Sequence, residues 1–359
     1  MYPALAVLKM LENEVQAVLW VGGVGGMETD LVTRAGVPFT AIPAAGVHGV
    51  GLRALPANLL RLVKGTLAAR RILAEFKPDV IFFTGGYVAA PVAVAGRHKP
   101  ILLYVPDIEP GLALRFLSRF SRVIALTAED SKQYFPQARA RLAVTGYPIR
   151  PELGQWDRSS ARQQLNLSDS LPVLLVAGGS KGAHTINQPV FANLAELLSM
   201  SQLVHITGSP DKVAADSARQ RLPEDLKERY HIFEYLHEDM GAALAAADLA
   251  VTRAGASTLG EYPLFGLPAI LVPYQFAWRY QKVNADYLRR HGAALILEAG
   301  QLSGQLLPTV HSLFIDPRRL QSMRQAMQAL SRPDAAGKIA SLVRELAGEI
   351  PGGKGAQSW

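Results

Sequence analysis

Residues 173–187 read VLLVAGGSKGAHTIN and combine an apolar run, a glycine-rich turn and the start of a helical pattern. The apolar run Val173–Ala177 has the length and composition of a strand that is buried on both faces. A glycine-rich turn, Gly178–Gly182, follows this run, and a helical pattern extends over Asn187–Leu198. A buried strand, a turn and a helix in this order predict a parallel sheet covered by helices.

The glycine-rich turn suits an anionic ligand. Glycines let the backbone approach a phosphate group, and the free N–H groups at the start of the next helix can hold its oxygens. Ser180 adds a hydroxyl donor and Lys181 a positive charge. The glycine spacing fits neither a P-loop nor a dinucleotide fingerprint. We therefore favour a phosphate site here over a purely structural turn, which remains the alternative.

A second strand, loop and helix spans residues 247–261. Arg253 leaves the strand at its carboxyl end, where a guanidinium can clamp a diphosphate, and Gly255 permits close backbone approach. Ser257 or Thr258 is expected to cap the helix, one turn before Glu261. The Glu261 carboxylate can accept hydrogen bonds from two ribose hydroxyls; the alternative is a plain helix-dipole partner.

A third loop follows the predicted strand Ala269–Val272 and is polar and aromatic. Trp278 offers an apolar face to a sugar. The side chains expected to bond sugar hydroxyls are Gln275, Tyr280, Gln281 and Asn284. Ligands of doubly wound sheets bind at the carboxyl ends of the strands, so three such loops together indicate a nucleotide diphosphate-sugar site.

The same alternation runs through the whole chain of 359 residues, which fits two domains. The other predicted strands are Val15–Val21, Val80–Thr84, Ile101–Val105, Val123–Thr127, Leu203–Thr207, His231–Glu234, Leu249–Val251 and Ala294–Leu297. We expect an N-terminal domain over 1–147, a second domain over 148–335, a helix over 336–350 that packs back on the first domain, and a disordered tail, 351–359. The chain opens unusually, with a helical pattern (Pro3–Leu11) before any strand.

Composition excludes several classes of protein. Hydrophobic residues make up 49% of the chain and charged residues 19%, which is typical of a globular protein. The absence of cysteine removes disulfides, thiolate nucleophiles and cysteine metal sites, and is compatible with a reducing cytoplasm. The histidines show no metal-ligand spacing, so we expect no metal cofactor. The uncharged stretch 80–96 contains Gly85, Gly86 and Pro91, which favour a strand, turn and helix over a membrane span.

The positive charge is concentrated in the first half. Residues 1–150 carry 17 Lys and Arg against 10 Asp and Glu, and the rest of the chain is balanced. A basic half indicates a phospholipid, nucleic acid or pyrophosphate partner, or only a soluble basic face. The helical pattern Leu60–Glu75 is basic and amphipathic, which fits either a membrane-facing helix or a packed surface helix.

Two loops of the first half are candidate site elements. Gly85-Gly86-Tyr87 repeats the strand, glycine and helix design, and is a candidate anion site on the acceptor side. Asp107 and Glu109 follow the strand Ile101–Val105 and are candidate general bases, although lone loop acids are usually solvated.

Taken together, these segments resemble the MurG family of glycosyltransferases in order and spacing. The matching segments include Lys77-Pro-Asp-Val, Gly85-Gly-Tyr-Val, Thr145-Gly-Tyr-Pro-Ile-Arg150, Gly178-Gly-Ser-Lys-Gly-Ala, Ala247-Asp, Arg253-Ala-Gly-Ala, Glu261, Gly266-Leu-Pro-Ala, Pro273-Tyr-Gln and Gln281 with Asn284-Ala285. The resemblance implies a GT-B fold, two doubly wound Rossmann-like α/β domains facing across a cleft. It implies inverting transfer of N-acetylglucosamine from its UDP form to the muramyl 4-hydroxyl of a polyprenyl-pyrophosphate-linked acceptor, at the cytoplasmic face of the membrane.

The resemblance also assigns roles. Residues implied for the UDP-sugar are Gly179, Ser180, Lys181, Gly182, Arg150, Leu236, His237, Arg253, Gly255, Ala256, Glu261, Tyr280 and Gln281. Leu236 and His237 would contact the uracil, and Glu261 the ribose. Residues implied for the acceptor are Gly85, Gly86, Tyr87 and Asp107. The implied partners are UDP-N-acetylglucosamine, the lipid-linked acceptor and an anionic membrane surface, with no nucleic acid and no metal.

The chain departs from the family pattern in three places. It lacks the opening strand and glycine-rich loop with its histidine, which we expect upstream codons to supply. The family's His-Glu-Gln-Asn loop is replaced by Tyr104-Val-Pro-Asp107, and Tyr147 and Tyr280 replace an asparagine and a glutamine. The catalytic residue is therefore unassigned. A different glycolipid or polyprenyl acceptor, and an inactive UDP-sugar-binding protein, are the alternatives; the missing Gly-x-Gly-x-x-Gly argues against a nicotinamide oxidoreductase.

Overall fold

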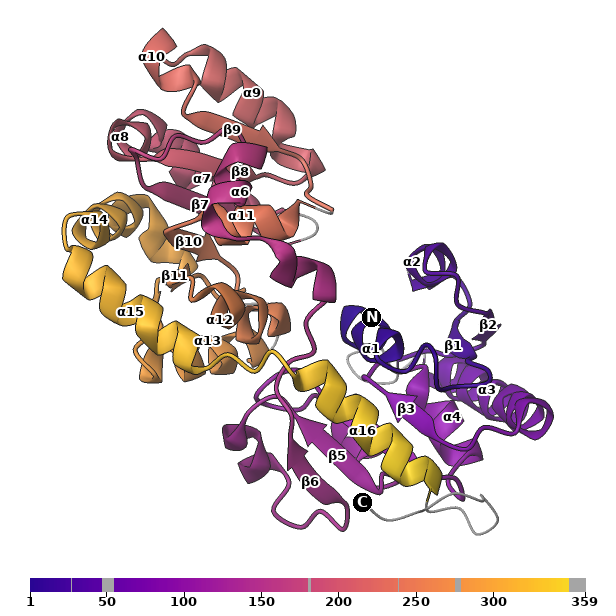
Figure 1. The fold of residues 1–359 in the computed structure, drawn as a ribbon. Coiled ribbons are helices and arrows are strands. Elements are labelled where there is room, and N and C mark those ends of the chain that lie inside the picture. Colours follow the sequence, from indigo (N-terminus) through magenta and orange to yellow (C-terminus); the bar gives the residue numbers. More distant parts are fainter. Residues whose placement is uncertain (27, 47–54, 180–181, 238, 275–278, 349–359) are drawn as a thin grey trace. The chain divides into compact units, whose positions relative to one another are not determined.

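The computed structural model describes residues 1–26, 28–46, 55–179, 182–237, 239–274 and 279–348 (Figure 1). They form two compact units. The first comprises Met1–Pro148 together with the segment from Asp334 onward, and the second is Ile149–Pro333. Each unit is built on parallel strands with helices beside them. The tail predicted over 351–359 lies outside the described residues.

The sheet of the second unit is entirely parallel and has the strand order β12-β11-β10-β7-β8-β9. Its strands are β7 (Val173–Ala177), β8 (Gln202–Ile206), β9 (Tyr230–Phe233), β10 (Leu249–Thr252), β11 (Ala269–Leu271) and β12 (Ala294–Ile296). Strand β7 has the bounds predicted from the sequence and is buried along its whole length. Because β7 pairs with both β10 and β8, the turn that follows it lies between the loops of those two strands.

Helices cover this sheet. They are η2 (Pro151–Gln155), α6 (Arg158–Gln164), α7 (His184–Ala192), α8 (Leu194–Met200), η3 (Ser209–Asp211), α9 (Lys212–Gln220), α10 (Glu224–Lys227), α11 (Met240–Ala246), η4 (Ala256–Leu259), α12 (Glu261–Phe265), α13 (Tyr280–Arg290), η5 (Ala299–Gln301), α14 (Leu302–Phe314) and α15 (Pro317–Ala329). Ile186 and Val190 of α7 join strand residues such as Val176 in one apolar core. The predicted start at Asn187 was wrong, because α7 begins at His184, directly after the glycine turn.

The first unit holds two groups of parallel strands, the pair β1-β2 and a sheet with the order β3-β4-β5-β6. The strands are β1 (Trp20–Gly23), β2 (Phe39–Ile42), β3 (Ile81–Phe83), β4 (Ile101–Val105), β5 (Val123–Leu126) and β6 (Arg141–Val144). Among the described residues, β1 pairs with β2 alone and β3 with β4 alone. The prediction of a strand at Val15–Val21 was wrong in its bounds. The backbone N–H of Val15 still bonds to Leu11 in the turn after the first helix, so pairing starts only at Trp20.

The helices of the first unit are α1 (Tyr2–Lys9), α2 (Glu28–Arg34), α3 (Leu55–Phe76), α4 (Ala89–Ala95), α5 (Leu112–Leu117), η1 (Glu129–Tyr134) and α16 (Ala335–Gly348). The C-terminal helix α16 packs against α1 and β4 of this unit (Figure 1). Arg344 on α16 donates to the Glu14 carboxylate and to the carbonyl of Met10. In the described part of the chain, no helix has the length and apolar character needed to cross a bilayer.

Candidate functional site

Three loops of the second unit lie at adjacent carboxyl ends of its sheet. Strand β10 pairs with β7 on one side and with β11 on the other, and all three run in the same direction. The turn 178–182, the loop from Arg253 and the loop after Leu271 therefore leave the sheet at the same edge. This is the edge at which doubly wound sheets bind ligands.

The glycine turn after β7 depends on its glycines. Gly179 and Gly182 have φ values of 93° and 73°, in the left-handed region. A Cβ atom at Gly182 would lie 2.1 Å from the Thr207 carbonyl oxygen, so a larger residue would displace the turn from the end of β8. Ser180 and Lys181, predicted to contact the phosphate, lie outside the described residues.

Arg253 connects the three loops. Its Nη1 donates to the Val272 carbonyl at 3.1 Å, and its Nη2 donates to the Thr185 hydroxyl at the start of α7. The guanidinium also lies over the Tyr274 ring, 5.2 Å from the centroid. Partial burial lowers the pKa of Arg253 from its ordinary value, but an arginine remains charged at neutral pH. A fixed positive charge thus stands beside the glycine turn.

Glu261 is the first residue of α12 and is half-buried. Burial raises the pKa of Glu261 to about 7, and the nearby positive charge of Arg150 opposes this rise. The fold therefore brings together Glu261 and Arg150, two residues predicted to bind the donor. The group is poised to change charge near neutral pH, which is a common property of functional carboxyl groups.

The segment before Glu261 differs from its prediction. Gly255 and Ala256 are both half-buried; the short helix η4 begins at Ala256, directly after Gly255, and Gly260 precedes α12 without a side-chain cap. Thr258 does not cap α12, because its hydroxyl donates instead to the Gly255 carbonyl at 2.5 Å. The expected cap at Ser257 or Thr258 was therefore wrong. The loop is held from within by this hydrogen bond.

The loop after β11 is tied to the other two. Gln281 accepts a hydrogen bond from the Tyr274 backbone N–H at 2.8 Å through its Oε1. Asn284 is fully buried and donates to the Ala254 carbonyl at 3.1 Å. Asn284 thus supports the Arg253 loop, and the expectation that it bonds a sugar hydroxyl was wrong. Tyr280 is half-buried at the start of α13; Gln275 and Trp278 lie outside the described residues.

The residues expected at the uracil lie on the loop between β9 and α11. Leu236 is buried and His237 is exposed. The His237 ring packs edge-on against Tyr235, with 4.4 Å between the ring centroids. An aromatic pair of this kind at a loop surface can support a planar base.

The first unit carries the residues expected for the acceptor. Gly85 and Gly86, with φ values of 113° and 89°, link β3 to α4, and Tyr87 beside them is exposed. Asp107 is half-buried after β4. Glu109 is different, because it is buried and its carboxylate lies 3.1 Å from Arg115 Nη2. The expectation of a solvated Glu109 was wrong, and this ion pair argues against Glu109 as a general base.

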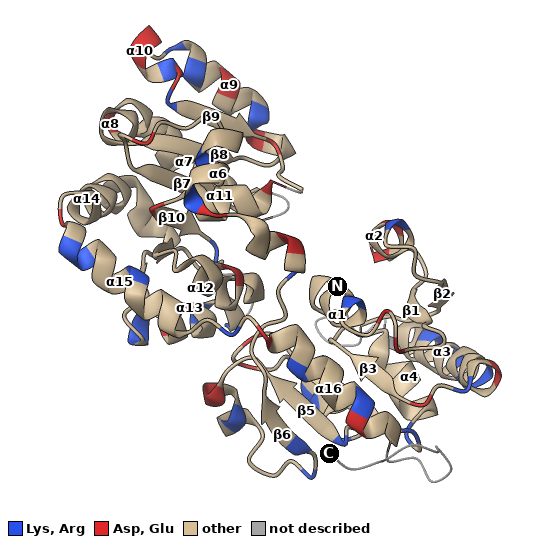
Figure 2. Cartoon of the chain, viewed as in Figure 1, with Lys and Arg blue, Asp and Glu red and all other residues tan. Residues whose placement is uncertain are grey.

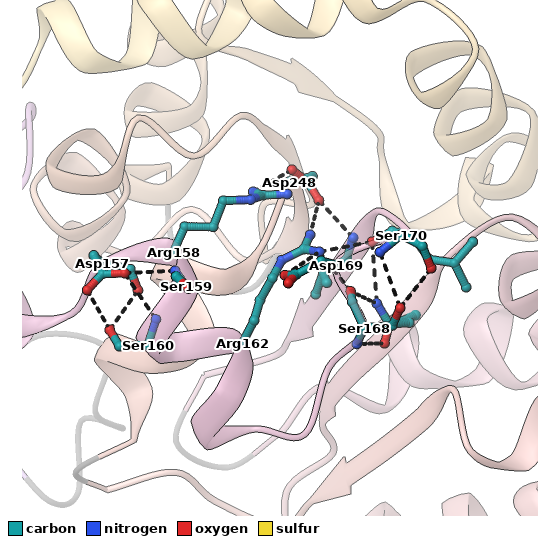
Figure 3. Close-up of polar contacts among 12 residues, drawn as sticks. Asp157, Arg158, Ser159, Ser160, Arg162, Ser168, Asp169, Ser170 and Asp248 are labelled. Carbon is teal, nitrogen blue, oxygen red and sulfur yellow. Dashed lines mark hydrogen bonds and ion pairs between the residues drawn. The ribbon is translucent and has the colours of Figure 1, made fainter.

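Sequence reasoning missed two polar clusters of the second unit. In one, Asp248 contacts Arg158 and Arg162 (Figure 3), and Arg324 contacts the same carboxylate. The other joins His184 at the start of α7 to Asp211 after β8. The spacing of Arg158 and Arg162, one helical turn apart, was the available signal for the first cluster. In the described residues, no group of three or more His, Asp or Glu side chains is placed to hold a metal ion.

Comparison with known proteins covers both units. The model of the glycosyltransferase family 28 N-terminal domain matches residues 1–126, and that of its C-terminal domain matches residues 173–339. Two similar relatives are both described as UDP-N-acetylglucosamine–N-acetylmuramyl-(pentapeptide) pyrophosphoryl-undecaprenol N-acetylglucosamine transferases. The Roseiflexus sp. (strain RS-1) protein is 42% identical over 92% of this chain and 84% of its own length. The Desulforudis audaxviator protein is 40% identical, over 97% and 95% respectively.

A solved structure agrees with these matches. The crystal structure of MurG from Acinetobacter baumannii superposes with a TM-score of 0.75 at 27% identity. The superposition covers 96% of this chain and 95% of that one.

Proposed function

Since this chain belongs to glycosyltransferase family 28, and within it to the MurG transferases, we propose that it transfers N-acetylglucosamine from UDP-N-acetylglucosamine to a lipid-linked acceptor. The acceptor is the N-acetylmuramyl-(pentapeptide) pyrophosphoryl-undecaprenol of the relatives' names, and the reaction completes the lipid-linked peptidoglycan precursor. The chain is an α/β protein of the GT-B class with two Rossmann-like units.

The convergence of the glycine turn, Arg253 and Glu261 carries the proposal. Arg253 reaches from β10 to the helix that follows the turn, so a diphosphate bound there would meet a guanidinium and free backbone N–H groups. Glu261, beside Arg150, offers a carboxylate to ribose hydroxyls. This arrangement supports a donor with a pyrophosphate and a ribose.

We assign the chemistry of transfer to electrostatic stabilisation of the leaving UDP. The acceptor hydroxyl attacks the anomeric carbon from the side opposite the diphosphate, and the configuration inverts. Negative charge then grows on the diphosphate, where Arg253 and the α7 N–H groups neutralise it without a metal. Asp107, which is half-buried after β4, is our candidate base. Asp107→Asn should lower kcat with little change in the donor KM, and EDTA should leave the rate unchanged.

Transfer of labelled N-acetylglucosamine to a panel of lipid acceptors tests the function directly. Only the muramyl-pentapeptide pyrophosphoryl lipid should accept the sugar. In parallel, UDP-N-acetylglucosamine should raise the unfolding temperature of the protein, and Glu261→Ala should remove that protection. Equal protection by GDP or NADH, without protection by UDP, would contradict the donor. Binding of UDP without transfer to any lipid would support an inactive binding protein instead.

We further propose that α3 binds an anionic membrane surface. Leu59, Leu60, Val63 and Leu67 are each 50–57% exposed. At 3.6 residues per turn they fall within about one third of the helix circumference. The exposed cations nearby on α3 are Arg61, Lys64, Arg70 and Arg71, drawn in blue in Figure 2. An apolar stripe with basic residues nearby is typical of a helix that lies in a membrane interface. We propose that the membrane bound by α3 is the one that carries the lipid acceptor.

Vesicle co-sedimentation tests this surface. The protein should bind vesicles that contain phosphatidylglycerol more tightly than vesicles of phosphatidylcholine alone. The double variant Leu60→Ser with Val63→Ser should bind both kinds of vesicle more weakly. The double variant Lys64→Gln with Arg71→Gln should lose the preference for anionic lipid. Val213→Ser is the matched control, because Val213 is 76% exposed on α9 of the other unit. Equal loss in the control would contradict a role specific to α3.

A further inference from the structure

His184 occupies an unusual position in the second unit. It is the first residue of α7 and follows the glycine turn, yet its side chain is 69% exposed. Its Nδ1 lies 2.8 Å from Oδ1 of Asp211, which is buried at the end of η3. An exposed ring is therefore anchored by a buried carboxylate at the point where the proposed diphosphate site begins.

A row of buried polar groups continues behind this pair. Asn187 Nδ2 donates to the second oxygen of Asp211 at 2.7 Å. Asn187 Oδ1 lies 3.0 Å from His205 Nε2, and His205 Nδ1 lies 2.9 Å from the Tyr230 hydroxyl. Asn187 and His205 are fully buried, and Tyr230 is nearly so. A satisfied buried network of this kind holds its members in one arrangement.

The hydrogen-bond directions in this row can be deduced. Asn187 Nδ2 also donates to the Thr207 carbonyl at 2.9 Å, which identifies the amide nitrogen because a carbonyl only accepts. Burial lowers the pKa of His205 to about 3, so His205 is neutral and donates from Nε2 to Asn187 Oδ1. At the other end, the Asp211 carboxylate accepts, so His184 donates from Nδ1. The Nε2 atom of His184 is thereby left to face outward.

The turn is flanked on two sides. On the β10 side, Arg253 donates to Thr185, the second residue of α7. On the β8 side, His184 is held by Asp211. Asp211 lies on the segment after β8, which begins with Thr207, the residue whose carbonyl oxygen a Cβ atom at Gly182 would meet. Two consecutive residues at the start of one helix are thus engaged with groups from the two strands that border β7.

We propose that His184 is a further donor-binding residue, which holds a phosphate oxygen of UDP through its Nε2–H, with Asp211 as its positioning residue. The inference rests on the proposed function. With Nδ1–H anchored on Asp211, Nε2 takes up a proton from solvent as the phosphate binds, and the ring then presents one charged donor, whose bond to phosphate is stronger than a neutral one. The contact would strengthen as charge develops on the leaving diphosphate, and no covalent step is involved.

Binding of UDP, UMP and uridine by calorimetry tests this role, because uridine has the base and ribose without phosphates. In His184→Ala the Kd for UDP should rise about tenfold, while the Kd for uridine should stay unchanged. His184→Lys should recover most of the UDP affinity, and His184→Gln should recover little. His291→Ala is the matched control: His291 is exposed in the same unit and also bonded through Nδ1, to the Tyr287 carbonyl. It should bind UDP as the unaltered protein does.

The positioning role of Asp211 has its own signature. Asp211→Asn should weaken UDP binding less than His184→Ala and leave uridine binding intact, and the two changes combined should cost no more than His184→Ala alone. If His184→Ala weakens UDP and uridine equally, or weakens neither, the inference is overturned while the proposed function stands. If the unaltered protein binds no UDP, the proposed function fails and the inference fails with it.

Discussion

Glu261 shows how burial can prepare a single residue for binding. A carboxyl group half-buried at the start of α12 loses hydration, and this raises its pKa to about 7 from an ordinary 4.5. The ionised form offers both oxygens as acceptors to two ribose hydroxyls and accepts more strongly, whereas the protonated form keeps one oxygen as an O–H donor. Donor binding should therefore be coupled to the loss of one proton near neutral pH.

The first prediction follows from this coupling. Affinity for UDP-N-acetylglucosamine should rise as pH increases from 6 to 8, by up to about tenfold per unit below the pKa. Stability of the ligand-free protein should change in the opposite sense. Because the pKa of Glu261 is raised in the folded chain, the folded chain keeps a proton that the unfolded chain loses above about pH 4.5. The stabilisation of the folded state by this group is therefore full below about pH 4.5, and it is lost as pH rises through about 7. Calorimetric titrations across pH measure both effects, and Glu261→Gln should lose this group's share of each slope.

Arg253 gives a second prediction. Arg253→Lys keeps the charge but cannot reproduce the bonds to Val272 and Thr185 together with the contact over the Tyr274 ring. The KM for UDP-N-acetylglucosamine should rise roughly 10- to 100-fold, which corresponds to about 1.5–3 kcal/mol for charged hydrogen bonds. Initial rates at varied donor concentration provide the measurement. Arg289→Lys, at an exposed pair on α13, should change nothing, and an unaltered KM in Arg253→Lys would speak against the assignment.

Side-chain partners explain which site residues the sequence could predict. Arg253 and Glu261 could be picked out as candidates because they bracket a glycine-containing loop at the end of an apolar run, and both features are local. The partners of Glu109 and Asn284 are set by the fold. Arg115 folds back from α5 onto Glu109, and Ala254 comes to Asn284 only when β10 and α13 are placed together. The contact between His184 and Asp211 is also set by the fold, because His184 follows β7 and Asp211 follows β8.

At the scale of elements, Asp248 joins four parts of the second unit. Its carboxylate accepts from the Val173 backbone N–H at the start of β7 and lies 2.9 Å from Arg162 on α6. Arg158 of α6 contacts its other oxygen at 2.7 Å (Figure 3), and Arg324 of α15 lies 3.4 Å from the same oxygen. The Arg162 side chain is nearly inaccessible to solvent. The nearby Asp248 carboxylate therefore offsets the buried positive charge of its guanidinium.

A third prediction tests this cluster. Asp248→Asn keeps the size of the side chain but leaves Arg162 buried beside a neutral group, at a cost of roughly 3–5 kcal/mol. For a protein of this size that corresponds to a fall in Tm of several degrees. Asp169→Asn is the control, because Asp169 is 88% exposed and 3.9 Å from the same arginine, and its Tm should hardly move. Equal Tm values for both variants in thermal unfolding would refute the role of Asp248.

The elements recovered from sequence share a property that the missed ones lack. Strands β4 and β7 are uninterrupted apolar runs buried along their length, and the predicted bounds were confirmed. Strand β6 starts with an exposed arginine and is nowhere fully buried, so no apolar run marks it. The helix predicted over Asn187–Leu198 is divided at Asn193 into α7 and α8. Local periodicity predicts long buried elements, whereas edge strands and helix breaks are decided by tertiary contacts.

On the scale of the whole molecule, the chain passes from the first unit to the second after Pro148 and returns after Pro333. The returning helix α16 buries Ile339, Leu346 and neighbouring alanines in the first unit. Arg141 on β6 adds an ion pair to Glu345 at 2.6 Å. The first unit is therefore completed by residues that follow the entire second unit in sequence, and its stability depends on the C-terminal segment.

This dependence gives a fourth prediction. Ile339 is fully buried, so Ile339→Ala should destabilise the first unit by about 2–5 kcal/mol, because it leaves a cavity in a core contact of α16. Hydrogen exchange followed by mass spectrometry should show faster exchange in α1 and β4, while exchange in β7 and β10 is unchanged. UDP affinity, which we assign to the second unit, should be unaltered. Lys338→Ala is the control on the same helix, because Lys338 is exposed. Faster exchange in β7 as well would mean that the two units unfold together, and would contradict the expectation that the effect is confined to the first unit.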